Sequence, residues 1–398
     1  MRHTTHAAPL ALIFTLSACD LLSPPAAPPA APISGARGDL LSTLAHHTYP
    51  RLYSDALTRA EELNERLASW EGAPSEEARA AWRALALAWQ RAELAQVGPA
   101  GASGLRVGGR DLRDLIYAYP LHNPCRVDQE LVANDFSEPG WAGRAVISAR
   151  GLDALERLLF TDDDANACAS AININRDGTW AALSPEDLAA RRAGLARVLS
   201  ADLAAQLTAL RAAWAGDGES ARALAVGDAP FSSAREALDQ VYAALLYLDK
   251  VSRDLKLAIP LGVSPDCAAE RCPELLEHAP SGLSRDALIA NLEGFLLIFE
   301  GRASLEGEGG EGEALVGFDD VLAAEGAGEL AADMSAKARA VIEALRPLNA
   351  DLALTLRDDP DALLDAYEQL RALTTLLKSQ LATVLNLSLP MEGAGDND

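Results

Sequence analysis

The chain contains long stretches of helical periodicity and no convincing stretch of strand-like alternation. Apolar residues recur at helical spacing, and Gly and Pro residues interrupt this pattern. The clearest helix start is Ser184-Pro185-Glu186-Asp187, with an N-cap residue, a proline in the first position and acids in the first turn. The pattern predicts an all-α protein built as helical bundles. We expect its long helices over residues 40–70, 75–97, 147–160, 184–214, 231–259, 285–300, 327–345 and 359–385.

Breaks in this pattern predict the domain organisation. The chain has 398 residues, of which 49% are hydrophobic, so it can bury a large core. We predict two helical-bundle halves, over residues 39–215 and 231–391, joined by a linker over 216–230. The glycine- and glutamate-rich stretch 301–312 indicates a surface insertion, and residues 392–398 indicate a loose tail.

The N-terminus predicts export and lipid anchoring. Residues 1–18 have a basic start and an apolar run too short to span a membrane, so they are expected to be a signal peptide. The run ends in Leu16-Ser17-Ala18-Cys19, which resembles a bacterial lipobox with Cys19 as the lipidated residue; an ordinary secretory signal cleaved nearby is the alternative. The Pro- and Ala-rich stretch 19–38 is expected to be a disordered tether. We therefore expect a lipid-anchored protein on the periplasmic face of the inner or outer membrane.

The net charge indicates which classes of partner the chain can bind, and the number of cysteines indicates whether it contains disulfides. The formal net charge of −24 argues against nucleic-acid binding and fits a protein that attracts cations. Beyond Cys19, four cysteines remain, and an even number in an exported chain indicates disulfides. Three pairings are possible, of which we favour Cys125–Cys168 and Cys267–Cys272 over the others. A zinc-thiolate site is the alternative, but the spacing of Cys267 and Cys272 has no partner pair.

Two acids on one predicted helix are the main candidates for a binding site. Asp153 and Glu156 are three residues apart, so both project from one flank of the apolar stripe of helix 147–160. They could chelate a hard cation. Helix ion pairs with Arg150 and Arg157 are the simpler alternative. Trp89 lies one turn before Glu93, and that pair could line a pocket.

Known catalytic motifs are missing from the sequence. It contains no HExxH, GxSxG or CxxC, and no GxGxxG after a strand, so no catalytic residue is predicted. Beyond the signal peptide the histidines are His46, His47, His122 and His278, and three of them lie near prolines or in predicted breaks. A solvated histidine is the default expectation there.

The stretch Gly151-Leu152-Asp153-Ala154-Leu155-Glu156 resembles the GxHxxE signature of the imelysin-like family, with Asp153 in place of the histidine. Other segments similar to that family follow in the right order. They are Trp82 to Pro99, Tyr119-Pro120, Lys256-Leu257 with Pro260-Leu261-Gly262, Glu277 to Gly301 with Asn291-Leu292-Glu293-Gly294, and residues 377–398. The resemblance covers nearly all of residues 40–398.

The resemblance implies an exported, often lipid-anchored protein with two helical halves and a groove between them near the motif. Such proteins are associated with iron uptake, and some bind a metal through the motif's His and Glu. A carboxylate at position 153 would favour hard ions such as Fe, Ca or Mg over Zn, or would mark a member that has lost the metal. The candidate residues for the groove are Asp153, Glu156, Glu93, Glu277 and Trp89.

The leading hypothesis is therefore a lipid-anchored binding protein that serves iron or other metal acquisition, with a metal-uptake receptor or transporter as its partner. The alternatives are a metallopeptidase, as the founding member of the family was first described, and a docking or scaffold lipoprotein that binds no metal.

Overall fold

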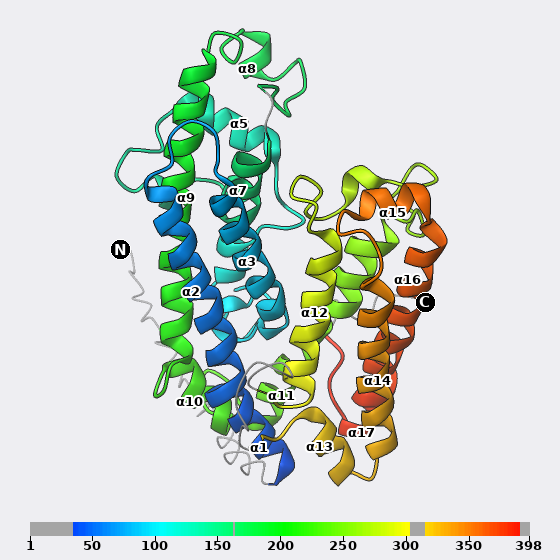
Figure 1. The fold of residues 1–398 in the computed structure, drawn as a ribbon. Coiled ribbons are helices and arrows are strands. Elements are labelled where there is room, and N and C mark those ends of the chain that lie inside the picture. Colours follow the sequence, from blue (N-terminus) through cyan, green and yellow to red (C-terminus); the bar gives the residue numbers. More distant parts are fainter. Residues whose placement is uncertain (1–34, 162–163, 303–314, 391–398) are drawn as a thin grey trace, which may run out of the picture. The chain divides into compact units, whose positions relative to one another are not determined.

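The computed structural model describes residues 35–161, 164–302 and 315–390, which form helices and no strand (Figure 1). The prediction of an all-α fold is confirmed. The signal peptide, Cys19, nearly all of the predicted tether, most of the insertion and the tail lie outside the described residues. No helix in the described ranges has both the length and the apolar character that a membrane crossing requires.

A first group of helices is built around three long antiparallel neighbours. Its elements, with η marking 3-10 or π-type turns, are α1 (Ala36–Thr43), η1 (Leu44–Thr48), α2 (Tyr49–Ala68), α3 (Glu76–Ala92), η2 (Glu93–Ala95), η3 (Gly98–Ala100), α4 (Leu112–Ile116), α5 (Pro124–Ala133), α6 (Trp141–Arg144), η4 (Ile147–Ala149), α7 (Gly151–Phe160), α8 (Asn173–Arg176), α9 (Pro185–Trp214) and α10 (Glu219–Val226). Helix α2 packs against α3 and α9, and α7 packs against both α3 and α9.

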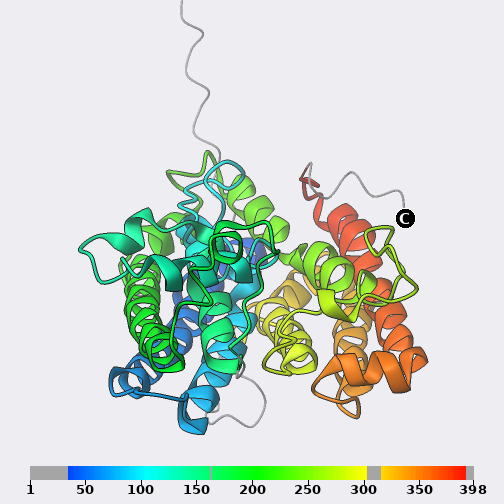
Figure 2. The ribbon, with the colours of Figure 1, turned by 90° about the horizontal axis from the view of Figure 1, so that it is seen from above.

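A second group of helices follows in the chain. Its elements are α11 (Ala234–Leu245), η5 (Leu248–Ala258), η6 (Pro273–Leu275), α12 (Ser284–Phe299), α13 (Phe318–Ala324), α14 (Gly328–Leu345), α15 (Leu352–Asp358), α16 (Pro360–Leu376), η7 (Leu377–Leu381) and α17 (Ala382–Leu385). Helix α12 contacts α3 on one side and α14 on the other, and α14 packs against α16. Figure 2 shows α12, in yellow, on the side of the second group that faces the first group.

The structure departs from the predicted helices where the backbone changes direction. The expected helix 147–160 is broken at Arg150, which is extended with φ −124° and ψ 177°. The expected helix 231–259 divides into α11 and the π-type segment η5. The predicted linker 216–230 contains α10, which its Gly and Pro content did not suggest. The boundaries of the two halves stay a prediction.

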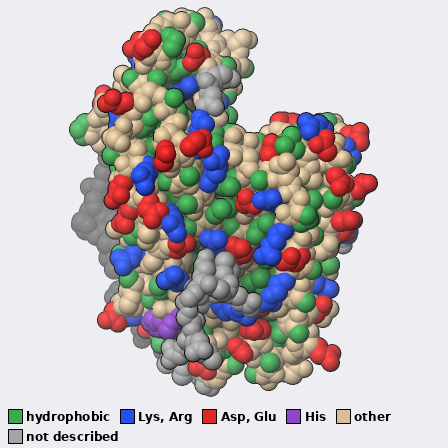
Figure 3. Space-filling view, viewed as in Figure 1, with side chains coloured by type: hydrophobic (Ala, Val, Ile, Leu, Met, Phe, Trp, Pro, Cys, Tyr) green, Lys and Arg blue, Asp and Glu red, His purple; other side chains and the backbone are tan. Residues whose placement is uncertain are grey.

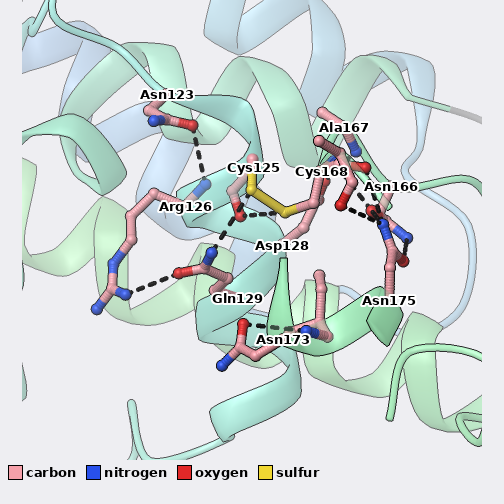
Figure 4. The surroundings of a disulfide bond; sticks show 12 residues. Asn123, Cys125, Arg126, Asp128, Gln129, Asn166, Ala167, Cys168, Asn173 and Asn175 are labelled. Carbon is pink, nitrogen blue, oxygen red and sulfur yellow. Dashed lines mark hydrogen bonds between the residues drawn. A yellow bond between two sulfur atoms is a disulfide. The ribbon is translucent and has the colours of Figure 1, made fainter. Parts of the chain in front are cut away.

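Two disulfides join the four remaining cysteines, as predicted. Cys125 bonds Cys168 and Cys267 bonds Cys272, with S–S distances of 1.98 and 2.05 Å. The first ties the start of α5 to the loop after α7, where Asp128 accepts a hydrogen bond from the Ala167 backbone N–H (Figure 4). Of the three possible ways to pair the four cysteines, the structure has the one that we favoured.

The two groups of helices approach closely at a glycine. A Cβ atom placed on Gly294 of α12 would lie 2.1 Å from the backbone oxygen of Arg91 in α3. That distance is shorter than atoms tolerate, and the contacted atom belongs to backbone that cannot rotate away. Glycine at position 294 therefore permits the spacing between α3 and α12.

We predict that Gly294→Ala destabilises the protein by about 1–3 kcal/mol, because the added methyl group must push two packed helices apart. Urea unfolding measures this change. Gly143→Ala in α6 is the matched control, since nothing lies within 4 Å of its added Cβ. Equal stability of the two variants would contradict the proposed close approach.

Candidate functional site

Helix α7 begins in a conformation that requires the glycine of the motif. Gly151 has φ +70°, and a Cβ atom there would lie 2.4 Å from the backbone oxygen of Ile116. The indole N–H of Trp82 donates to the backbone oxygen of Leu152 at 3.1 Å. The first turn of α7 is thereby fixed against both α3 and the end of α4.

Asp153 is a buried carboxyl with one oxygen engaged. Its side chain is 5% exposed, and Oδ2 accepts the backbone N–H of Ala118 at 2.7 Å. The other oxygen has no hydrogen-bond partner among the described residues. Burial raises the pKa of Asp153 to about 7, and repulsion from Glu156 adds to this effect. The site therefore contains an acid that gains or loses its proton near neutral pH.

Glu156, one turn later, has both oxygens engaged. Oε2 lies 3.0 Å from Nδ1 of His278, and Oε1 accepts the hydroxyl and the backbone N–H of Ser281 at 2.6 and 3.1 Å. Burial favours the neutral ring of His278, but the negative charges of Glu156 and Glu277 outweigh burial and raise its pKa. The motif glutamate thus fixes the chain before α12 to α7.

The arginines near Asp153 form ion pairs with other acids. Arg150 pairs with Asp202 at 2.6 Å, and Arg157 pairs with Asp128 at 3.0 Å. The helix ion-pair alternative is therefore wrong for Asp153. Its physical reason is the break at Arg150, which turns that side chain toward α9.

A buried lysine connects four elements behind the motif. Lys256 of η5 is 1% exposed, and its ammonium group lies 2.9 Å from Glu277, 2.8 Å from the amide oxygen of Gln90 and 2.7 Å from that of Asn291. Burial lowers the pKa of Lys256 against the opposing effect of Glu277. For Glu277, burial would raise the pKa, but Lys256, His278 and a hydrogen bond from Tyr117 lower it overall. The junction joins α3, η5, α12 and the segment before α12.

A cavity of about 540 Å³ lies over the motif residues. It is lined by Tyr119, Pro120, His122, Pro124, Asp153, Glu156, Arg157, Ala167, Leu255, Ile259, Glu274, Leu275, Leu276, Glu277, His278, Ala279 and Pro280. Residues next to both disulfides line the cavity. Pro124 and Ala167 are the chain neighbours of Cys125 and Cys168, and the lining segment that starts at Glu274 follows shortly after Cys272. The cavity therefore brings together Asp153, Glu156 and Glu277 from the predicted set.

The other two predicted residues lie elsewhere. Glu93 and Trp89 are 0% and 1% exposed and do not line this cavity. Glu93 forms an ion pair with Arg113 at 3.1 Å, and burial raises its pKa despite that arginine. The indole nitrogen of Trp89 has no partner among the described residues. This pair is thus part of the interior that supports the site.

Two histidines line the cavity, and the sequence analysis did not propose either of them for the site. His278, expected to be solvated, is 4% exposed and adopts φ +57°. His122 also lines the cavity, its Nδ1 is buried without a partner among the described residues, and burial lowers its pKa to about 4. The one sequence feature that could have pointed to His278 is its position next to Glu277, which was already a candidate residue of the groove. Proximity to prolines gave the opposite indication and was wrong for His278.

The donor groups do not form a ready-made site for a bare metal ion. Within the described ranges, no three His, Cys, Asp or Glu side chains are grouped so as to hold one. The physical reason is that His278 and Ser281 occupy both oxygens of Glu156, while Nε2 of His278 lies 3.2 Å from Tyr117 and Gln90. The structure provides an acid-lined cavity in which one carboxylate oxygen of Asp153 is free of hydrogen bonds from the described residues.

A second hollow, between α12 and α14, has its charges balanced. Glu300 pairs with Arg302 at 3.0 Å and with Arg339 at 2.8 Å, and Arg346 pairs with Glu343. Figure 3 shows basic side chains interspersed with acidic ones over this face. We therefore place the candidate site at the cavity over α7.

We predict that stability depends on pH through Asp153. An unfolded Asp titrates near 3.8, whereas folded Asp153 titrates near 7, so the folded state binds more protons between these values. Its contribution to stability therefore falls by about 1.4 kcal/mol per unit as pH rises through this window. Asp153→Asn keeps an oxygen for the Ala118 N–H and carries no charge. We expect the variant to exceed wild type by roughly 1–3 kcal/mol at about pH 8 and to match it near pH 4.

Urea unfolding between about pH 4 and pH 8 measures this difference. Asp333→Asn, at an exposed acid on α14 that pairs with Lys337 at 3.0 Å, is the control, and its effect on stability should be much smaller than that of Asp153→Asn because exposed ion pairs contribute little. A difference between Asp153→Asn and wild type that stays constant across the pH range would count against a protonated Asp153.

Comparison with known proteins gave a family and two related folds. The family model described as Imelysin matches residues 46–379. A crystal structure of an imelysin-like protein from Psychrobacter arcticum 273-4 is similar, with a TM-score of 0.65 and 18% identity over 90% of this chain and 98% of that one. A putative iron-regulated protein A precursor from Parabacteroides distasonis ATCC 8503 gives a TM-score of 0.62 and 17% identity, over 90% and 96%. The search of curated proteins found no match.

Proposed function

This chain belongs to the imelysin family, and from that premise we propose that it is an exported, lipid-anchored binding protein that serves iron acquisition at the cell envelope. The cavity over α7 would capture the cargo. The observation that carries the proposal is a cavity of about 540 Å³ in which the buried carboxyl of Asp153 keeps one oxygen unbonded to any described residue. The name of the Parabacteroides protein supports the link to iron.

The arrangement favours a cation that arrives with ligands of its own. Carboxylate oxygens suit hard ions such as Fe³⁺, Ca²⁺ and Mg²⁺ better than Zn²⁺. Because Glu156 is held by His278 and Ser281, it can offer an oxygen only by breaking a hydrogen bond, whereas Asp153 and Glu277 each keep one oxygen without a hydrogen bond from the described residues. The cavity is large enough for an ion together with coordinated water or a chelator. A metal-uptake receptor or transporter in the same envelope would receive the cargo.

A metallopeptidase is less well supported. Such an enzyme needs a metal-bound water and a general base that can reach it. Glu156 would be the candidate base, but both of its oxygens already accept hydrogen bonds from His278 and Ser281. The geometry therefore favours binding over hydrolysis.

We predict saturable binding of iron that depends on the two motif acids. Isothermal titration of the chain with Fe³⁺, Fe²⁺, Ca²⁺ and Zn²⁺ should show binding of the hard ions with Zn²⁺ weakest. Asp153→Ala/Glu156→Ala should lower the affinity for iron by about tenfold or more. Glu329→Ala/Asp333→Ala is the matched control, because it removes two acids one turn apart from the exposed surface of α14. No binding by wild type, or equal loss in both double variants, would remove the proposal.

The anchor is tested separately from the cargo. We predict that Cys19→Ser leaves the chain in the soluble fraction of the envelope, whereas wild type sediments with membranes and incorporates labelled fatty acid. Because Cys19 is the residue that the lipobox would modify, no other cysteine should replace it. Membrane association that survives Cys19→Ser would rule out this mode of anchoring.

A further inference from the structure

The cavity over α7 has mostly apolar walls. Leu255 of η5 and Ile259 directly after it line the cavity, together with Leu275, Leu276 and several prolines from the segments around it. Its volume of about 540 Å³ lies within the usual range for small-molecule sites of roughly 300–1,000 Å³. An ion alone would leave most of this apolar surface without a contact. The walls therefore indicate a ligand that has an apolar part.

The charged groups that line the cavity leave a negative remainder. Two lining acids have basic partners: Glu156 has the imidazole of His278 at 3.0 Å and Glu277 has the ammonium group of Lys256 at 2.9 Å. The lining arginine, Arg157, pairs with Asp128. Of the charged side chains that line the cavity, Asp153 and Glu274 are the two without an ion pair among the described residues, and both are acids. A positive charge on the ligand would offset this remainder, and beside Asp153 it would favour the ionised form of that carboxyl.

Unpartnered polar atoms at the cavity are mainly acceptors. Asp153, 95% buried, has one carboxylate oxygen without a hydrogen-bond partner, and the Oε2 atom of Glu277, 97% buried, has none among the described residues either. Nδ1 of His122 is the third such atom. The Oε2 atom of Glu277 is fully buried without a donor, which is costly, so a ligand that brings N–H groups would be favoured there. Tyr119 adds an aromatic ring to the lining, and this ring stacks on Tyr117 and lies 6.0 Å from the ammonium group of Lys256.

We propose that the cavity takes a small organic cation, in which an ammonium or guanidinium group is carried on an apolar body and Asp153 is its counter-ion. This inference rests on the proposed function in one respect, that the cargo occupies the cavity over α7. It adds the chemical class of that cargo. A chelator that carries an amine would satisfy both proposals, since its iron would arrive already coordinated.

Hexylammonium is a suitable probe, with 1-hexanol and hexanoate as neutral and anionic molecules of matched length. Titration calorimetry of the mature chain should show saturable binding of hexylammonium and affinities about tenfold or more lower for the other two. Asp153→Asn should weaken hexylammonium by about tenfold and leave 1-hexanol unchanged. Glu329→Gln/Asp333→Asn, on the exposed surface of α14, should leave hexylammonium binding as in wild type.

Three results would overturn the inference: no hexylammonium binding at about 10 mM, equal affinity for hexylammonium and 1-hexanol, or unchanged hexylammonium affinity in Asp153→Asn. The comparison of the three probes uses wild type alone, so the inference stays falsifiable if the variant fails to fold. If the wild-type chain binds iron but not hexylammonium, only this inference is overturned. If it binds hexylammonium but not iron, only the proposed function is overturned.

Discussion

The site depends on the buried ammonium group of Lys256. Taking a charge out of water is costly, and the cost is offset only where the charge is paired and fully hydrogen-bonded. Lys256 meets this condition through Glu277, Gln90 and Asn291, which lie on three different parts of the chain. Each partner must be in place at once, so the lysine fixes the segment that carries Glu277 and His278 relative to α3 and α12.

The π-type segment η5 carries the lysine of this junction. Asp249, Ser252, Arg253 and Lys256 are all buried on this segment, although charged side chains are rarely fully buried unless they are paired. Ser252 and Lys256 both reach Asn291 of α12. This row of polar side chains therefore connects the second group of helices to the motif.

The exchange of histidine for aspartate at position 153 coincides with a histidine supplied from elsewhere. His278 comes from the segment before α12 and lies against Glu156, so the glutamate of the motif has an imidazole partner in this chain. Asp153 turns instead to the backbone N–H of Ala118. The result is a cavity with one carboxyl of raised pKa and a glutamate that is already satisfied. That combination supports the cationic cargo that we propose.

The sequence by itself determined the helical class, because periodicity is a property of neighbours along the chain. Its even number of cysteines indicated disulfides and left three pairings possible, and the structure has the pairing that we favoured. Helix α9 begins at Pro185 and ends at Trp214 as expected, since its cap and its first-turn acids are local signals. Only the tertiary structure decided which acids face the cavity. Glu93 and Glu277 looked alike as candidates, yet one pairs with Arg113 in the interior and the other meets Lys256 beside the cavity. Partners such as His278 and Ser281 lie more than 120 residues from Glu156, and no local pattern encodes a contact over that separation.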